Sequence, residues 1–101
     1  MRITKIMGTN LELTDAIRDY VEEKTMSLEK FCEDVSPCDL AVEVGKTSER
    51  HQKGDIWRCE LMLTLPGKTL RTERVTDDLY SAIDTAKDDL KRQLVEYKEQ
   101  R

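Results

Sequence analysis

The sequence is poor in the residues that build catalytic sites. Its 101 residues include one histidine, His51, and four glycines that stand apart from one another. Isolated glycines do not make a phosphate-binding loop. A serine or cysteine nucleophile would have only His51 as a histidine base, and that residue lies in a basic segment without an obvious orienting carboxylate. We therefore expect a protein that is not an enzyme and needs no cofactor.

Cysteine is also scarce. Cys32, Cys38 and Cys59 are an odd number, so they cannot form a fully paired disulfide framework. Their spacing matches no zinc signature, which predicts that no metal is bound. We expect three reduced thiols, at least one of them packed in the core, as is usual in the cytoplasm.

Long apolar runs are missing. The opening residues 1–8 lack the apolar stretch of a signal peptide. No segment approaches the roughly 20 apolar residues of a membrane span. We therefore expect a cytoplasmic protein with no membrane partner, folded as a single domain over residues 1–101.

Neither sign of charge dominates. Seventeen basic and 21 acidic residues give a net charge of −4, and hydrophobic and charged residues each make up 38% of the chain. An acidic domain lacks the overall basic footprint of nucleic-acid binders, which argues mildly against such a partner. Net charge is a poor guide where the two signs are segregated, so the positions of the lysines decide the question.

Hydrophobic periodicity predicts the elements of the N-terminal half. Residues 2–13 are expected to be extended. Thr14 is a suitable N-cap for a helix from about Asp15 to Lys30, in which apolar residues recur at helical spacing. Residues 40–44 then alternate in the manner of a strand.

The C-terminal half predicts a hairpin and a long helix. Residues 57–65 alternate with period two, Pro66-Gly67 is a turn pair, and residues 68–75 return as an antiparallel strand. Thr76 is expected to cap a helix of about 20 residues. The order β-α-β-β-β-α favours an α+β fold, with a four-stranded antiparallel sheet and both helices packed on one face.

Charges on the second helix are segregated. At about 100° per residue, four basic residues fall within an arc of about 80° beside the apolar stripe. They are Lys87, Lys91, Lys98 and Arg101. Tyr80 lies on the same line, whereas Arg92 falls among the acids. One interpretation is a solvated helix with ion pairs such as Asp84–Lys87; the other is a helix that follows phosphates.

Further basic residues lie elsewhere. Arg18, Lys24 and Lys30 fall on the first helix, where Lys24 interrupts the apolar stripe. Its side chain either extends along the surface to reach water or faces a ligand. A polar loop adds Arg50, His51 and Lys53, which are typical of an ordinary charged loop as well as of an RNA contact.

Short motifs that run in order along nearly the whole chain suggest a family. They are LTDAIRDYV at 13–21, LEKF at 28–31, KGD at 53–55, PGKTLR at 66–71, DDLYSAID at 77–84 and KRQL at 91–94. Together they resemble the ribosome hibernation promoting factors, also called ribosome-associated translation inhibitors. The stretch at 77–84 is the most specific of the six.

The resemblance implies a fold akin to double-stranded RNA-binding domains and a place in the channel between head and body of the small ribosomal subunit. There, family members exclude messenger RNA and transfer RNA and keep the ribosome idle. The implied contacts to ribosomal RNA are Arg18, Lys24, Lys30, Lys87, Lys91, Arg92 and Lys98. Secondary candidates are Arg50, His51, Lys53 and Arg101.

The resemblance also sets limits. The chain ends just after the second helix, so we expect a short form without the C-terminal dimerisation domain, monomeric in solution and with no DNA partner. Its net charge is acidic, and Ser27 stands where a lysine would suit the family pattern. Both departures predict weaker or more salt-sensitive binding. Two alternatives stay open: a double-stranded RNA-binding module that acts away from ribosomes, and a protein-interaction adaptor that uses the uncovered sheet face.

Overall fold

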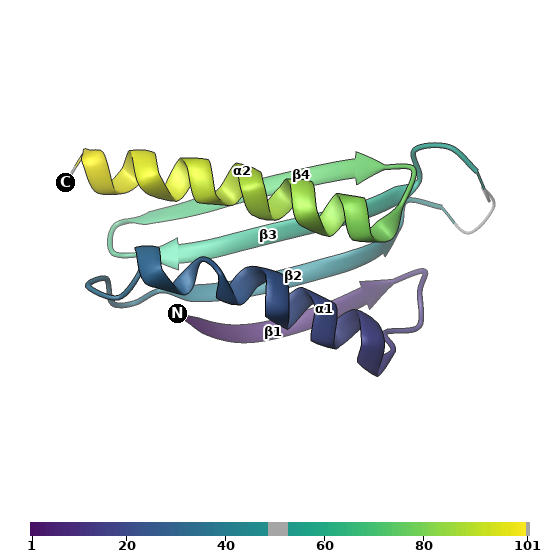
Figure 1. The fold of residues 1–101 in the computed structure, drawn as a ribbon, viewed down its shortest axis with the longest axis horizontal. Coiled ribbons are helices and arrows are strands. Elements are labelled where there is room, and N and C mark those ends of the chain that lie inside the picture. The colour runs from purple at the N-terminus through teal and green to yellow at the C-terminus, as the bar shows by residue number, and fades with distance from the viewer. Residues whose placement is uncertain (49–52, 101) are drawn as a thin grey trace.

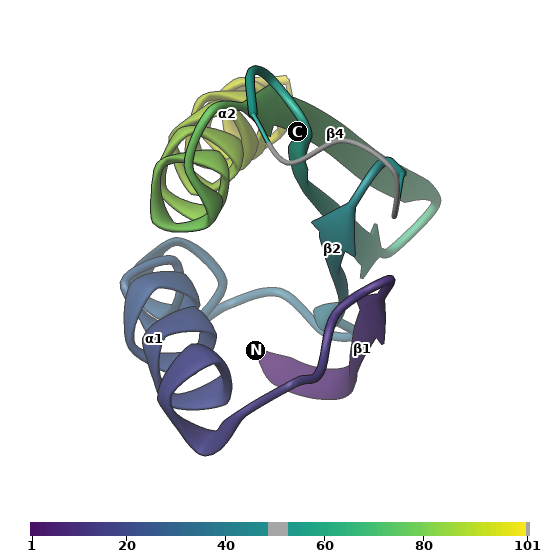
Figure 2. The ribbon, with the colours of Figure 1, turned by 90° about the vertical axis from the view of Figure 1, so that its right-hand side faces the viewer.

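Four strands and two α-helices make up the part of the chain that the structure, a computed structural model, describes: residues 1–48 and 53–100. The elements in order are β1 (Arg2–Thr9), α1 (Asp15–Met26), the short 3₁₀ helix η1 (Glu29–Phe31), β2 (Asp39–Lys46), β3 (Trp57–Leu65), β4 (Lys68–Thr76) and α2 (Leu79–Glu99). The strands form one layer, and both helices cover the same face of it (Figures 1 and 2). The predicted α+β class and element order are confirmed.

The sheet is mixed, and the prediction of an antiparallel sheet was wrong in one strand pair. The strand order is β1-β2-β3-β4. β1 pairs with β2 in parallel, while β2 with β3 and β3 with β4 pair antiparallel. The reason is the connection: a chain that crosses over through a helix returns in the original direction, whereas a tight turn reverses it.

Two glycines are needed in the sheet, one for a turn and one for a close approach between strands. Gly67 adopts a φ of 71° in the two-residue turn between the paired residues Leu65 and Lys68. Such a positive φ strains other residues. Gly45 pairs with Thr9 of β1, and a Cβ atom there would lie 1.9 Å from the Thr9 carbonyl oxygen. A side chain at position 45 would therefore push β1 away from β2.

The first helix ends earlier than the predicted Lys30. α1 stops at Met26, and the Leu28 and Phe31 amides then make shorter 3₁₀-type bonds to Thr25 O and Leu28 O. Buried Thr25 also donates its hydroxyl to Val21 O. Such i→i+3 bonds tighten the end of a helix and rotate the following residues. Lys30 consequently lies on η1 and not on α1.

The second helix begins two residues later than predicted. Its N-cap is Asp78, whose carboxylate accepts a hydrogen bond of 2.9 Å from the Ser81 amide. Thr76, the predicted cap, instead donates its hydroxyl to the Asp78 carbonyl. An aspartate at this position also suits the positive end of the helix dipole.

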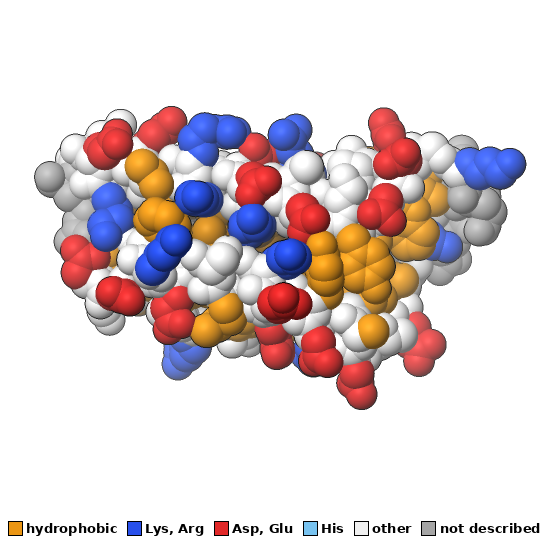
Figure 3. Space-filling view, in the orientation of Figure 1, with side chains coloured by type: hydrophobic (Ala, Val, Ile, Leu, Met, Phe, Trp, Pro, Cys, Tyr) orange, Lys and Arg blue, Asp and Glu red, His pale blue; other side chains and the backbone are white. Residues whose placement is uncertain are grey.

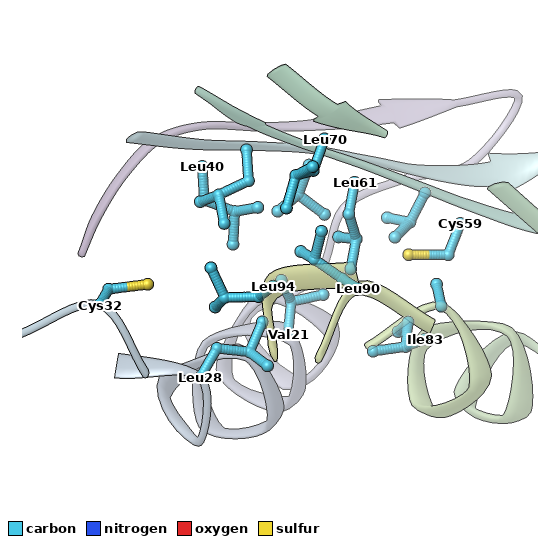
Figure 4. Packing of buried hydrophobic residues seen from close by; sticks show 14 of the residues in the cluster. Val21, Leu28, Cys32, Leu40, Cys59, Leu61, Leu70, Ile83, Leu90 and Leu94 are labelled. Atoms are coloured by element: carbon cyan, nitrogen blue, oxygen red, sulfur yellow. The ribbon is translucent and has the colours of Figure 1, made fainter. Parts of the chain in front are cut away.

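The core lies between the sheet and the helices (Figure 4). Inward-facing residues of the strands, such as Leu40 and Leu61, meet Leu90 and Leu94 of α2 and Val21 of α1; all five are buried. The three cysteines are free thiols, as predicted, and all three are buried, where at least one was expected to be. Burial raises the pKa of the Cys59 thiol to about 12.

No helix within residues 1–48 and 53–100 combines the length and apolar character that a membrane crossing requires.

Candidate nucleic-acid interface

Two tyrosines join α1 to α2. The rings of Tyr20 and Tyr80 meet edge to face, with centroids 4.5 Å apart and planes at 82°. Tyr20 also donates its hydroxyl to an Asp84 oxygen at 2.8 Å. Burial, and then this hydrogen bond to a carboxylate, raise the Tyr20 pKa to about 12. The contact fixes the line along which the two helices lie side by side.

Two lysines from distant parts of the sequence share one aromatic ring on this line. The Lys30 ammonium lies 5.4 Å from the centroid of the Phe31 ring, and that of Lys91, on α2, lies 5.5 Å from the same centroid. Attraction between a cation and the ring quadrupole is worth about 0.5–1 kcal/mol at exposed sites. Phe31 thus brings the positive charges of η1 and α2 together.

Lys24 reaches the same line from α1. Its ammonium lies 5.3 Å from the centroid of the Tyr20 ring, and the side chain is half-buried. This position agrees with a side chain that extends along the surface, whereas contact with a ligand stays a prediction. The stem covers apolar surface, while the charge lies at the junction of the helices.

Five lysines form what we call the lysine band. They are Lys24, Lys30, Lys87, Lys91 and Lys98. On the helix face, basic side chains follow the middle of the surface between α1 and α2, with acidic side chains on both sides (Figure 3). The band is therefore narrow and flanked by acidic side chains, in a molecule whose net charge is −4.

Carboxylates limit the charge of the band at two of its members. Lys87 contacts the neighbouring Asp88 at 2.6 Å, and Lys98 contacts Asp34 at 3.1 Å. Both acids are well exposed, so the pairs are weak and easily exchanged for another anion. The predicted Asp84–Lys87 pair is not the arrangement found in the described part of the chain, since Asp84 binds Tyr20 instead.

The structure does not bring every candidate of the sequence into the band. Arg18 is exposed on α1 but lies about 160° around the helix from Tyr20, at 100° per residue. Arg92 contacts Asp89 at 2.6 Å, and the same carboxylate binds Arg74 of β4. Lys53 is exposed in the loop before β3. Arg50, His51 and Arg101 lie outside the described residues.

The sequence did not reveal the role of two aromatic residues. Tyr20 and Phe31 were assigned to the apolar stripe of one helix, yet each lies beneath one or two lysine ammonium groups. The sequence did offer one signal, since Lys24 and Lys30 each lie within four residues of an aromatic residue, close enough for an ammonium group to reach its ring. The second lysine at the Phe31 ring, Lys91 of α2, could not be predicted, because it is 60 residues further along the chain.

The opposite face of the sheet holds its charges differently. Glu43, Glu60 and Glu73 lie side by side on β2, β3 and β4. Arg58 contacts them at 3.4, 3.1 and 2.7 Å respectively, and Arg71 binds the last two as well. These arginines are held by carboxylates of the protein itself.

The same open face carries a small pocket of about 120 Å³, lined in part by Lys5, Met7, Ala41 and Met62. Within residues 1–48 and 53–100, no three His, Cys, Asp or Glu side chains gather as metal ligands would. The lysine band is thus the stronger candidate for a ligand surface.

Comparison with known proteins identifies the family. The model of the family described as sigma 54 modulation protein / S30EA ribosomal protein matches residues 4–101. The chain belongs to this family. Relatives named ribosome hibernation promotion factor confirm the resemblance inferred from the motifs, and this family is not known as one of enzymes.

Two relatives illustrate the match. The chain is 40% identical to the ribosome hibernation promotion factor of Staphylococcus aureus over 94 residues, which is 93% of the chain and 47% of the relative. For the same-named protein of Deinococcus radiodurans, the identity is 34% over 98 residues, 97% of the chain and 50% of the relative. The chain therefore spans about half the length of these relatives.

A solved structure matches at similar identity. The N-terminal domain of Thermus thermophilus Protein Y is 39% identical and superposes with a TM-score of 0.81, covering 96% of this chain and 99% of that one. The S30EA family member described here is thus similar, in sequence and in fold, to a structure solved as an N-terminal domain.

Proposed function

We propose that this chain binds ribosomal RNA of the small ribosomal subunit through the lysine band and holds the ribosome idle. The observation that carries the proposal is the convergence of Lys30 and Lys91 on one ring, which joins the positive charges of two separate segments. Similar proteins carry the name ribosome hibernation promotion factor, which supports a ribosomal partner.

The chemistry of the band suits phosphates. A lysine ammonium is a compact point charge with three donors, and it can keep its position over a ring while it donates to a phosphate oxygen. Five such groups along α1, η1 and α2 would release about five condensed counterions. Log affinity should then fall with log salt at a slope of roughly −3.5 to −4.5.

The proposed mechanism is occupancy and involves no catalysis. Bound in the channel between head and body, the domain would fill space that messenger RNA and transfer RNA need. Initiation would stop for as long as the domain stays bound. We propose that it acts in this way as a monomer in the cytoplasm.

Charge reversal tests the lysine band. Replacing Lys87, Lys91 and Lys98 together by glutamate should abolish co-sedimentation with purified small subunits in sucrose gradients, because attraction to phosphate becomes repulsion. A matched variant reverses Arg2, Lys5 and Lys68, three exposed residues of β1 and β4 that are not among the candidate contacts, and changes the net charge equally. Equal loss in both variants, or loss in neither, would refute the role of the band.

Occupancy of the channel needs a separate test. Pre-bound protein should reduce the retention of a labelled messenger and initiator transfer RNA on small subunits, and excess messenger should displace the protein in turn. If protein and messenger bind the same subunits without affecting each other, the proposed place of binding is wrong even though the ribosome is still the partner.

The open sheet face supports a second candidate function. Met7 and Met62 are 38% and 39% exposed beside the small pocket, on the face where Arg58 and Arg71 are paired with glutamates. A protein that docked there would bind with little dependence on salt. An unchanged binding constant between low and high salt, together with retained binding in the band variant, would favour this adaptor role.

A duplex-RNA module acting away from ribosomes remains the other alternative to test. A mobility-shift assay with a short RNA duplex, run beside purified small subunits, separates the two. Tighter binding to the duplex than to subunits at equal salt would favour this alternative.

A further inference from the structure

An exposed aromatic ring lies at one end of the lysine band. Tyr80 is 39% exposed in the first turn of α2, while its neighbour Leu79 and the next inward residues, Ala82 and Ile83, are buried. The core therefore closes without Tyr80. Figure 3 shows an apolar patch directly beyond one end of the basic side chains, towards the N-terminal end of α2 as drawn in Figure 1.

The Tyr80 ring is held in place by its neighbours. Tyr20 meets it edge to face at 4.5 Å, and the Tyr20 hydroxyl is tied to Asp84 of α2 at 2.8 Å. The Lys24 ammonium lies over the Tyr20 ring. A ring fixed in this way loses little conformational freedom when a ligand stacks on it, which favours binding.

We propose that Tyr80 is a stacking site for an unpaired RNA base, at the end of the phosphate path that the lysine band follows. The inference rests on the proposed binding of RNA by that band. Lys87 follows Tyr80 by about 10 Å along the helix axis, at 1.5 Å per residue, and lies on nearly the same side of α2. An RNA strand could thus place a base on Tyr80 and its next phosphates along the lysines.

A nucleobase fits this place for a general reason. Proteins that bind single-stranded nucleic acid combine a positive groove with aromatic side chains, because every base has a face that stacks on a ring. Phe31, the other aromatic of the band, already has two ammonium groups near its ring. The target is therefore RNA with at least one base out of the helical stack and not a continuous duplex.

Short oligomers test the stacking site without ribosomes. The probes are a uridine hexamer and a hexamer with the same sugar-phosphate backbone but no bases, both at low salt. The wild-type protein should bind the uridine hexamer more tightly, by roughly 5- to 150-fold if one base stacks. Tyr80→Leu should remove this ratio, and Tyr80→Phe should keep it. Equal binding of the two hexamers by the wild-type protein, at any level, overturns the inference.

A matched control guards against indirect effects. Met62 has the same 39% exposure but lies on the open face of the sheet, so Met62→Leu should leave the ratio unchanged. Thermal unfolding of each variant shows whether it is folded. A ratio that survives Tyr80→Leu in a folded protein places the base elsewhere and overturns the inference.

Small subunits separate this inference from the proposed function. Tyr80→Leu should weaken subunit binding at every salt concentration without changing the salt slope, since stacking releases no counterions. If Tyr80→Leu binds subunits like the wild type while the lysine-band reversal does not bind, the stacking site is refuted and the proposed function stands. If the wild type does not bind subunits but binds the uridine hexamer more tightly than the base-free hexamer, the proposed function is refuted and the stacking site stands.

Discussion

Basic side chains are arranged in opposite ways on the two faces of this molecule. On the open face of the sheet, Arg58 is 20% exposed and contacts three glutamates within 3.4 Å. On the helix face, the ammonium groups of Lys24, Lys30 and Lys91 lie about 5 Å from ring centroids of Tyr20 and Phe31. The first arrangement satisfies the charge within the protein. The second positions the charge and leaves its hydrogen-bond donors for a partner.

The difference would allow an acidic protein to bind a polyanion, as we propose. A planar guanidinium matches several carboxylates at once and is suited to bridging strands. An ammonium over a ring gains attraction without being neutralised. The net charge counts a basic residue in the same way whether a carboxylate neutralises it or not. For this reason the net charge argued against a nucleic-acid partner, whereas the positions of the lysines support the proposal of one.

The largest expected effect comes from removing the bridging arginine. Arg58→Met leaves three neighbouring glutamates without their shared partner, and we expect a loss of about 2–3 kcal/mol in the free energy of unfolding, less than for a fully buried pair. Urea denaturation measures it. Subunit binding by the folded fraction should keep its salt slope. An unchanged stability would show that the network contributes only surface contacts.

The matched change on the helix face should act on binding instead. Lys91→Met removes one phosphate contact, so the salt slope should become shallower by about 0.7–0.9 and low-salt affinity should fall several-fold. Stability should change by no more than about 0.5 kcal/mol. Sedimentation at a series of salt concentrations gives the slope. If Lys91→Met lost as much stability as Arg58→Met, the lysines of the helix face would also serve folding, and the proposed difference between the two faces would be wrong.

A smaller effect should come from the acids beside the lysine band. Asp34→Asn frees the Lys98 ammonium from its 3.1 Å contact and removes a negative charge near the phosphate path. We expect tighter subunit binding, about two- to fivefold at low salt, because one nearby repulsion of roughly 0.5–1 kcal/mol is removed. Asp19→Asn, at an exposed position of α1 about 100° around the helix from Tyr20, is the control. Equal gains in the two variants would indicate a general charge effect.

The smallest expected effect concerns acid stability. The hydroxyl of Thr9 donates to Glu43, and this bond, helped by Arg58, lowers the Glu43 pKa below its ordinary value. A lowered folded-state pKa contributes stability above the ordinary value and loses it as pH falls through the lowered one. Glu43→Gln should cost less than about 1 kcal/mol at neutral pH and should flatten the loss of stability in acid. Urea titrations at neutral pH and near pH 3 give the comparison.

Local pattern was enough for most elements but not for their ends. Period-two alternation and the Pro66-Gly67 pair predicted the hairpin, which is observed with strands Trp57–Leu65 and Lys68–Thr76. The end of α1 and the cap of α2 were misplaced by two to four residues. These ends depend on hydrogen bonds of Thr25 and Asp78, where several residues of similar propensity compete.

The sequence by itself determined the secondary structure, the family and the segregation of charge on α2, because all three are local or periodic properties of the chain. Only the tertiary structure decided the parallel pairing of β1 with β2 and the membership of the lysine band. It placed the ammonium groups of Lys30 and Lys91 at the Phe31 ring, and it left Arg18 and Arg92 outside the lysine band. The physical reason is that contacts between distant segments depend on how whole helices pack, and a helical wheel describes only one helix at a time.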